Sequence, residues 1–236
     1  MTQPTWVGVA VSAALAIGLG ACGSSSTTSS SGEENKSADQ IFSDALDALN
    51  GVAVVHLAQS STDTSGVTKI DGTITGDAGR ATATDPSGTA TVIVVTGGSV
   101  YVSQGSSGFQ QITGDLATQV SSITIHQTVS CGRTEHGGLT KGSVSTVNGK
   151  RVIAIVDDGK APGASPESVF VALDGPPLPV RIAQTGPTTA GGSLACGRAS
   201  GSTVTSQTID IDYPSGSVTI TPPAVVGGAS SSSSST

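Results

Sequence analysis

Three cysteines are the residues of this 236-residue chain whose chemistry is easiest to interpret. Cys22 ends the tetrapeptide Leu19-Gly20-Ala21-Cys22, directly after an apolar run at residues 7–19. This run is too short to cross about 30 Å of hydrocarbon as a helix, and it is typical of a secretory signal peptide. Small residues before a cysteine resemble the bacterial lipobox, in which the thiol receives a diacylglyceryl group. We therefore predict that Cys22 is acylated and holds the chain to the outer side of the cell membrane.

The other two cysteines, Cys131 and Cys196, each begin the tripeptide Cys-Gly-Arg. Outside the cytoplasm, two remaining cysteines are expected to form a disulfide. The bond would close a loop of about 65 residues, which the chain-entropy argument values at roughly 4 kcal/mol. The alternative is a metal site made by Cys131 with His126 and His136. Their spacing is not a familiar zinc pattern and lacks a fourth ligand, so the disulfide is favoured.

The chain contains no other pattern that indicates catalysis. It has neither the G-x-S-x-G turn of a serine hydrolase nor the Gly-rich loop of a nucleotide-binding protein. The carboxylate pairs Asp157-Asp158 and Asp210/Asp212 are expected on solvated surface, and His56 within an apolar strand is expected to be a hydrogen-bonded core residue. We predict that the protein is not an enzyme and needs no cofactor.

The composition limits the class of protein further. Ten basic residues against seventeen acidic ones give a net charge of −7, the wrong sign for binding nucleic acid. Aromatic residues make up 3% and charged residues 11%, while glycine is abundant at 32 residues. This favours a turn-rich β protein over a helical bundle.

The chain divides into four segments. Residues 1–21 are predicted to be the signal peptide, residues 22–36 a disordered Ser/Thr-rich tether, residues 37–225 one β-rich domain, and residues 226–236 a disordered Ser-rich tail. The tether and the tail hold too little apolar surface to fold.

The domain is predicted to be mainly β (α+β), with nine or ten strands and one or two short helices. Ser37 and Gln40 form a capping box ahead of an amphipathic helix at 38–49, and a second helix is expected at 114–121. Period-two alternation predicts strands from residue 52 to a last strand containing Val218 and Ile220. Tight turns at Gly97-Gly98 and Asn148-Gly149 make the sheet mostly antiparallel. The segment around Cys131 is expected to be a loop.

The order of these elements resembles the actinobacterial LppX/LprG-like lipoproteins, which share the fold of the LolA/LolB lipoprotein carriers. The resemblance lies in the lipobox, in a helix ending at Asn50, and in short motifs over residues 37–223. These motifs include Gly97–Val102, Asn148-Gly149-Lys150, Leu178–Arg181 and Tyr213-Pro214. The resemblance implies one curved antiparallel sheet, a half-barrel, closed by helices over a cavity that binds or carries acylated lipids.

We accordingly expect a monomeric, membrane-anchored envelope lipoprotein that holds a lipid or another amphipathic ligand between sheet and helix. The candidate cavity residues are Ile41, Leu46, Leu49, Ile70, Ile74, Val92 and Val94. Since a one-residue change of phase reverses the faces of a strand, Ile93 and Val95 remain alternatives to Val92 and Val94 as cavity residues.

The other function left open is a tethered structural or protein-interaction module with no cavity.

Overall fold

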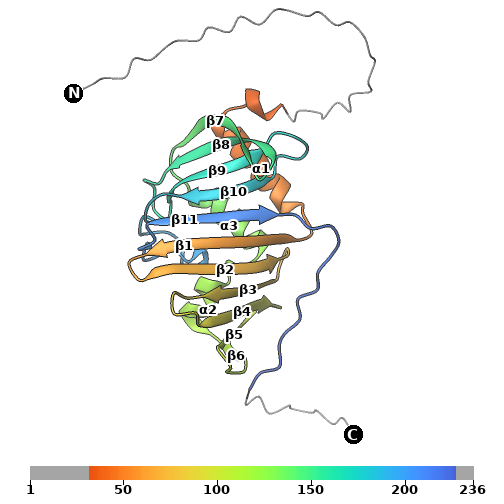
Figure 1. Ribbon diagram of the computed structural model, residues 1–236, viewed down its shortest axis with the longest axis vertical. Coiled ribbons are helices and arrows are strands. Elements are labelled where there is room, and N and C mark those ends of the chain that lie inside the picture. The colour runs from red at the N-terminus through yellow and green to blue at the C-terminus, as the bar shows by residue number, and fades with distance from the viewer. Residues whose placement is uncertain (1–31, 227–236) are drawn as a thin grey trace, which may run out of the picture.

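The computed structural model describes residues 32–226, which form one open antiparallel sheet of eleven strands (Figure 1). The strand order is β6-β5-β4-β3-β2-β1-β11-β10-β9-β8-β7, so strands from the two ends of the domain meet at the β1–β11 pair. The predicted mainly β fold with a single antiparallel sheet is confirmed. The strands are β1 Val55–Asp63, β2 Gly66–Ile74, β3 Gly79–Thr84, β4 Ala90–Thr96, β5 Ser99–Gln104, β6 Gln110–Ile112, β7 Leu139–Val147, β8 Lys150–Asp158, β9 Pro166–Ala172, β10 Pro179–Gln184 and β11 Ser206–Asp212.

The two predicted tight turns join β4 to β5 and β7 to β8. Asn148 and Gly149 have φ angles of 50° and 75°, and Gly97 and Gly98 have φ angles of 56° and 72°. Two successive residues with positive φ make a type I′ turn, whose twist matches that of the flanking strands. The local sequence therefore sets the register of both hairpins.

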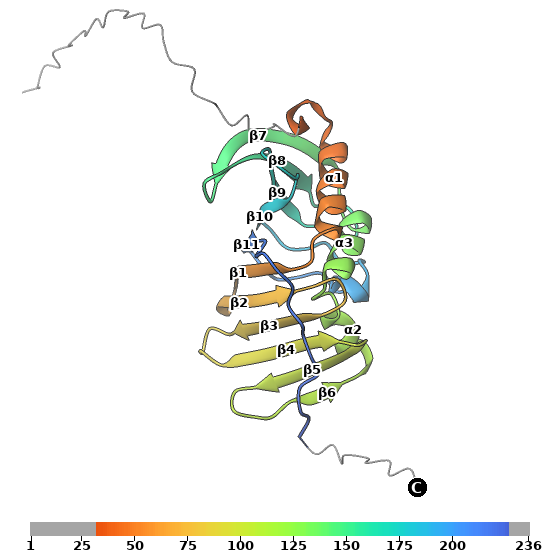
Figure 2. The same ribbon diagram turned by 90° about the vertical axis from the view of Figure 1, so that its right-hand side faces the viewer.

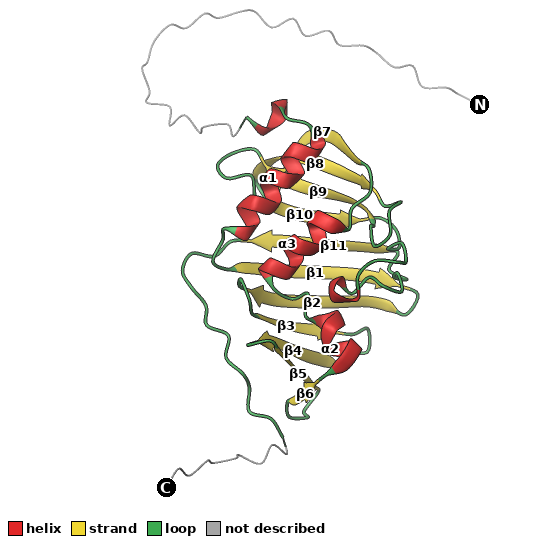
Figure 3. Ribbon diagram, turned by 180° about the vertical axis from the view of Figure 1, so that it is seen from behind, coloured by secondary structure: helices red, strands yellow, loops and turns green. Residues whose placement is uncertain are grey.

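Three α-helices lie on one face of the sheet: α1 Ala38–Asn50, α2 Gly114–Val120 and α3 Ile125–Thr134 (Figures 2 and 3). Two short 3-10 helices, η1 Glu33–Asn35 and η2 Leu194–Cys196, lie before α1 and between β10 and β11. The Ser37 hydroxyl accepts a hydrogen bond from the backbone amide of Gln40 at 3.2 Å, as the capping box predicts.

Helix α3 occupies the segment around Cys131, for which the sequence pattern had indicated a loop. Thr124 caps it by accepting a hydrogen bond from the Gln127 amide at 3.2 Å. Its apolar side consists of Ile125 and Val129, four residues apart and both buried. The capping pair was the available signal, and the β-branched residues and the glycine within the helix concealed it.

The predicted last strand around Val218 and Ile220 is not a strand. From Tyr213 the chain runs without regular structure along β1 to β6, and it makes an isolated bridge between Val225 and Phe109. Pro214, Pro222 and Pro223 supply no amide hydrogen for a ladder, which explains why apolar residues here do not pair as a strand.

Candidate functional site

The two faces of the sheet differ in what covers them. Val55 on β1 and Ile74 on β2 pack with Leu46 of α1 and Ile125 of α3, so their face is the one beneath the helices. We call it the covered face and the opposite side the outer face. Because side chains alternate along a strand, these positions assign every other residue of the sheet to one face.

Beneath α1 and α3 the covered face is filled by side chains. Ile41 has no exposed surface and packs against Ile153, Ile155 and Val169 of β8 and β9. Leu46 and Leu49 pack in a neighbouring cluster with Ile74 and Ile211. These predicted cavity residues therefore lie in a packed core between helix and sheet.

Over β1 to β6 the covered face carries no charged residue along three cross-strand rows. The first row runs Val55–Ile74–Gly79–Val95–Val100–Ile112, the second Leu57–Gly72–Ala81–Ile93–Val102–Gln110, and the third Gln59–Ile70–Ala83–Thr91–Gln104. We call these positions the neutral rows.

The charged residues of the same six strands lie elsewhere. His56, Lys69, Asp71 and Arg80 alternate with members of the neutral rows and so belong to the outer face. Asp63 lies at the β1–β2 turn, where its carboxylate accepts hydrogen bonds from two turn amides. From the first neutral row to the third, mostly buried aliphatic residues give way to a mixture that includes uncharged polar residues.

The large aliphatic residues of the neutral rows that stay half-buried outside the packed clusters are Ile70, Ile93, Val102 and Ile112. Helix α2 and η2 lie over this part of the sheet, whereas α1 and α3 lie over the other half (Figure 3). Between the bulkier side chains lie Gly72 and Ala81, whose small size leaves the backbone of the sheet close to the surface of this face. This half of the covered face is therefore the one where the helices leave aliphatic surface unpacked.

The register separates two of the predicted cavity residues, Val92 and Val94, from the others. Ile70 pairs with Ala83, and Ala83 with Thr91, so Ile93 and Val95 share the face of Ile70. Val92 and Val94 lie on the outer face, where Val94 is fully buried. The sequence could not decide this because residues 92–95 are apolar on both faces.

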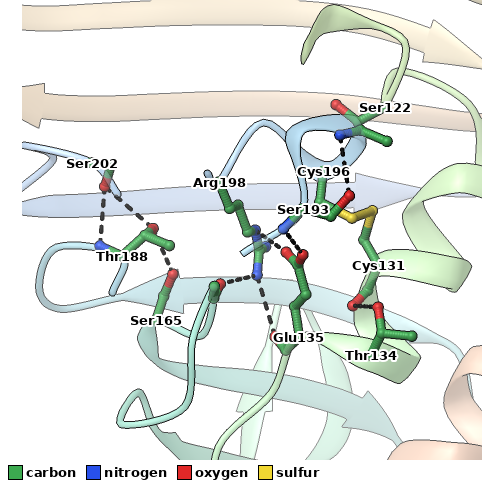
Figure 4. A network of polar contacts seen from close by, with 12 residues as sticks. Ser122, Cys131, Thr134, Glu135, Ser165, Thr188, Ser193, Cys196, Arg198 and Ser202 are labelled. Carbon is green, nitrogen blue, oxygen red and sulfur yellow. Dashed lines mark hydrogen bonds and ion pairs between the residues drawn. A yellow bond between two sulfur atoms is a disulfide. The ribbon is translucent and has the colours of Figure 1, made fainter. Parts of the chain in front are cut away.

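Cys131 of α3 and Cys196 of η2 form the predicted disulfide, with their Cα atoms 5.7 Å apart (Figure 4). The histidines of the alternative metal site have other partners. The His126 ring lies 2.8 Å from the Asp77 carboxylate, and the His136 ring packs edge-on against Phe42 with centroids 5.5 Å apart. Within residues 32–226 no group of His, Cys, Asp and Glu is arranged to hold a metal ion.

Glu135 holds the segment between β10 and β11 beside this disulfide. Its carboxylate accepts a hydrogen bond from the Ser193 amide and lies 4.0 Å from Nε of Arg198 (Figure 4). The Arg198 guanidinium also donates to the carbonyl oxygens of Glu135 and Gly163 at 3.4 and 3.0 Å. One buried carboxylate thus contacts residues on both sides of Cys196.

An acidic pair lies nearby on the covered face. Asp157 of β8 and Glu167 of β9 are cross-strand partners. The Asp157 carboxylate accepts hydrogen bonds from the amides of Gly137 and Gly159. Burial raises the pKa of Glu167 to about 7; the Arg198 charge lowers it in part, and the Asp157 charge, the smallest of the three effects, raises it. This carboxyl therefore titrates near neutral pH.

His56 is not the core residue that the sequence suggested. It lies on the outer face, where its Nε2 atom is 3.2 Å from the Asp71 carboxylate. It borders an open groove of about 480 Å³ between the sheet and the C-terminal segment. The groove is lined by His56, Thr73, Lys150, Asp212, Tyr213, Pro214 and Val218.

Cys22, the predicted signal peptide, most of the tether and the tail from residue 227 lie outside the described residues. Among the helices of residues 32–226, none has the length and apolar character needed to span a membrane.

Comparisons with known proteins give a likeness in structure only. No protein-family model matches the chain, and no curated protein matches it. The lipoprotein LppX of Mycobacterium tuberculosis is similar at a TM-score of 0.51 and 18% identity, over 78% of this chain and 99% of that one. LprF of Mycobacterium bovis gives a TM-score of 0.48 at 16% identity, over 79% and 97% of the two chains. The likeness to LppX confirms the predicted LppX/LprG-like, LolA-like fold.

Proposed function

We propose that this protein is an extracytoplasmic lipoprotein, anchored through an acylated Cys22, that binds a lipid or another apolar ligand and catalyses no reaction. The ligand lies against the neutral rows of the covered face, around Ile70, Ile93 and Val102. The protein acts as a monomer and takes no cofactor.

The absence of charge from the neutral rows carries this proposal. In a chain with a net charge of −7, the three charged side chains Lys69, Asp71 and Arg80 of β2 and β3 lie on the outer face. An apolar ligand is favoured where no charge must be desolvated, and aliphatic side chains with a few polar neighbours are usual at such sites. Ile70, Ile93 and Val102 supply aliphatic surface that the packed clusters leave unused.

The anchored location is supported by two independent observations. The lipobox Leu19–Cys22 follows an apolar run of signal-peptide length. The fold is also that of LppX, a lipoprotein whose structure is covered over 99% of its length.

A second function, a tethered interaction module without a ligand, is favoured by the packing under α1 and α3. There the predicted cavity residues Ile41, Leu46 and Leu49 are at most 7% exposed. A ligand at that place would have to displace them, which costs the packing energy of the core.

Native mass spectrometry of residues 23–236, secreted so that the disulfide forms, separates the two functions. An added mass that extracts into organic solvent, or that returns after incubation with envelope lipids, supports the ligand-binding function. A protein that stays free of ligand after both treatments contradicts it and leaves the interaction module.

A further inference from the structure

Helix α2 lies over the neutral rows but is held there by few packing contacts of its own side chains. None of its side chains is buried, and Leu116 is 55% exposed. A seven-residue helix without buried side chains is not stable by itself, so its position depends on its neighbours. Those neighbours are β5 and η2, and η2 approaches α2 closely: a Cβ on Gly197 would lie 3.4 Å from the Gln119 carbonyl oxygen.

The 3-10 helix η2 is in turn fastened to α3. The Cys131–Cys196 disulfide joins the two covalently, and Glu135 contacts Ser193 and Arg198 on either side of it (Figure 4). The residues of η2 are only half-buried. We call α2 and η2 together the α2–η2 cover.

Helix α3 is the fixed partner in this arrangement. Ile125 and Val129 are at most 4% exposed and pack against α1 and the sheet. The amide of Ile125 also donates to the Thr75 carbonyl oxygen at 2.9 Å, which ties the start of α3 to the end of β2. When the disulfide is broken, the less buried side is the one free to move.

We propose that the Cys131–Cys196 disulfide holds the α2–η2 cover closed over the neutral rows and thereby limits how fast an apolar ligand enters and leaves. This statement about ligand exchange rests on the proposed function. The statement about the cover itself does not, because it concerns only the ligand-free protein.

The test compares the wild-type protein with the variant C131S/C196S. Amide hydrogen exchange of residues 114–120 and 193–198 is expected to be faster by roughly tenfold or more in the variant, while exchange in α1 and β8 stays slow. Binding and release of Nile red, a neutral dye that fluoresces in apolar surroundings, are expected to be faster by a similar factor. Equal exchange in the cover and equal dye rates overturn the inference.

The matched control is Thr188→Ala, in the same connection between β10 and β11. Thr188 bonds Ser165 and Ser202, away from η2 (Figure 4). Its loss is expected to leave the exchange of α2 unchanged. Faster exchange of α2 in this control would show that general loosening of the β10–β11 connection, and not loss of the disulfide, opens the α2–η2 cover. That result would overturn the inference.

The outcomes separate this inference from the proposed function. Faster exchange in the cover without Nile red binding by either protein contradicts the proposed function. The conclusion that the disulfide holds the α2–η2 cover closed then still stands. Dye binding with unchanged exchange and rates contradicts the inference alone. Should the double variant unfold, the folded wild-type protein is reduced with a phosphine, two free thiols are confirmed by mass, and the same exchange and dye rates are measured.

Discussion

Val92 and Ile93 are adjacent in β4, both half-buried, and their side chains lie on opposite faces of the sheet. Ile93 belongs to the neutral rows, whereas Val92 lies on the outer face opposite Thr82. The two residues therefore form a matched pair for testing which face binds a ligand.

We expect Ile93→Asp to weaken the binding of Nile red by at least about tenfold, because a carboxylate must then be desolvated beneath an apolar ligand. Val92→Asp places the same charge on the same strand and is expected to leave binding within about twofold of wild type, a difference below 0.5 kcal/mol. Fluorescence titration measures both. Equal losses in the two variants would show that the charge acts through stability, and the assignment of the covered face as the ligand site would be wrong.

The sequence predicted those features that short segments determine. The capping box Ser37/Gln40 and the turn Asn148-Gly149 act through neighbouring residues, so both were placed correctly. The disulfide followed from there being only two cysteines in the predicted domain. Nothing in these patterns required the positions of distant strands.

The candidate site was less predictable because it depends on the register of five successive strand pairs. The neutral rows exist only once each of β1 to β5 pairs with the next strand in a defined register. The phase of Val92 to Val95 was ambiguous because both faces of β4 are apolar. Ile70 could be named from alternation alone, whereas Ile93 needed the register of β3.

The β7–β8 hairpin gives a prediction about stability. Asn148 has a φ of 50°, and its side-chain amide donates to the Asp210 carboxylate at 2.9 Å. Asn148→Ala is expected to lower the free energy of unfolding by about 1–2 kcal/mol, since alanine tolerates the left-handed conformation poorly and the hydrogen bond is lost. Urea denaturation measures the change.

Asn148→Gly is the control for this hairpin. Glycine removes the same hydrogen bond but adopts a positive φ freely, so the loss is expected to be smaller than for alanine. If the two variants lose equal stability, the backbone conformation at residue 148 contributes nothing measurable.

The proposed anchor gives a prediction about location. In the full-length chain, Cys22→Ser is expected to move the protein from the membrane fraction to the soluble fraction, because a diacylglyceryl group binds membranes stably and its absence leaves no anchor in the proposed scheme. Detergent phase partitioning measures this, and the mass of the N-terminal peptide shows the acyl chains. Ser26→Ala in the same segment is the control, and a Cys22→Ser protein that stays in the membrane fraction would refute the anchor.

The raised pKa of the Glu167 carboxyl leads to a prediction about how the stability of the protein depends on pH. Burial, opposed in part by the Arg198 charge, raises its pKa from 4.5 to about 7 in the folded state. Between these two values the folded protein keeps a proton that the unfolded chain has lost, so stability from this group is present below pH 4.5 and is lost as the pH rises through 7. The difference corresponds to at most roughly 3 kcal/mol.

Replacing Glu167 with Gln keeps the shape of the protonated carboxyl and removes the titration. The variant is expected to be more stable than wild type at pH 8 and to differ little from it at pH 4, so its advantage grows across this window. Urea denaturation at a series of pH values measures the advantage, with Asp174→Asn, an exposed acid between β9 and β10, as the control. Parallel curves for Glu167→Gln and wild type would mean that the Glu167 carboxyl ionises at the same pH in the folded and unfolded chains, and that burial beside Asp157 does not perturb it.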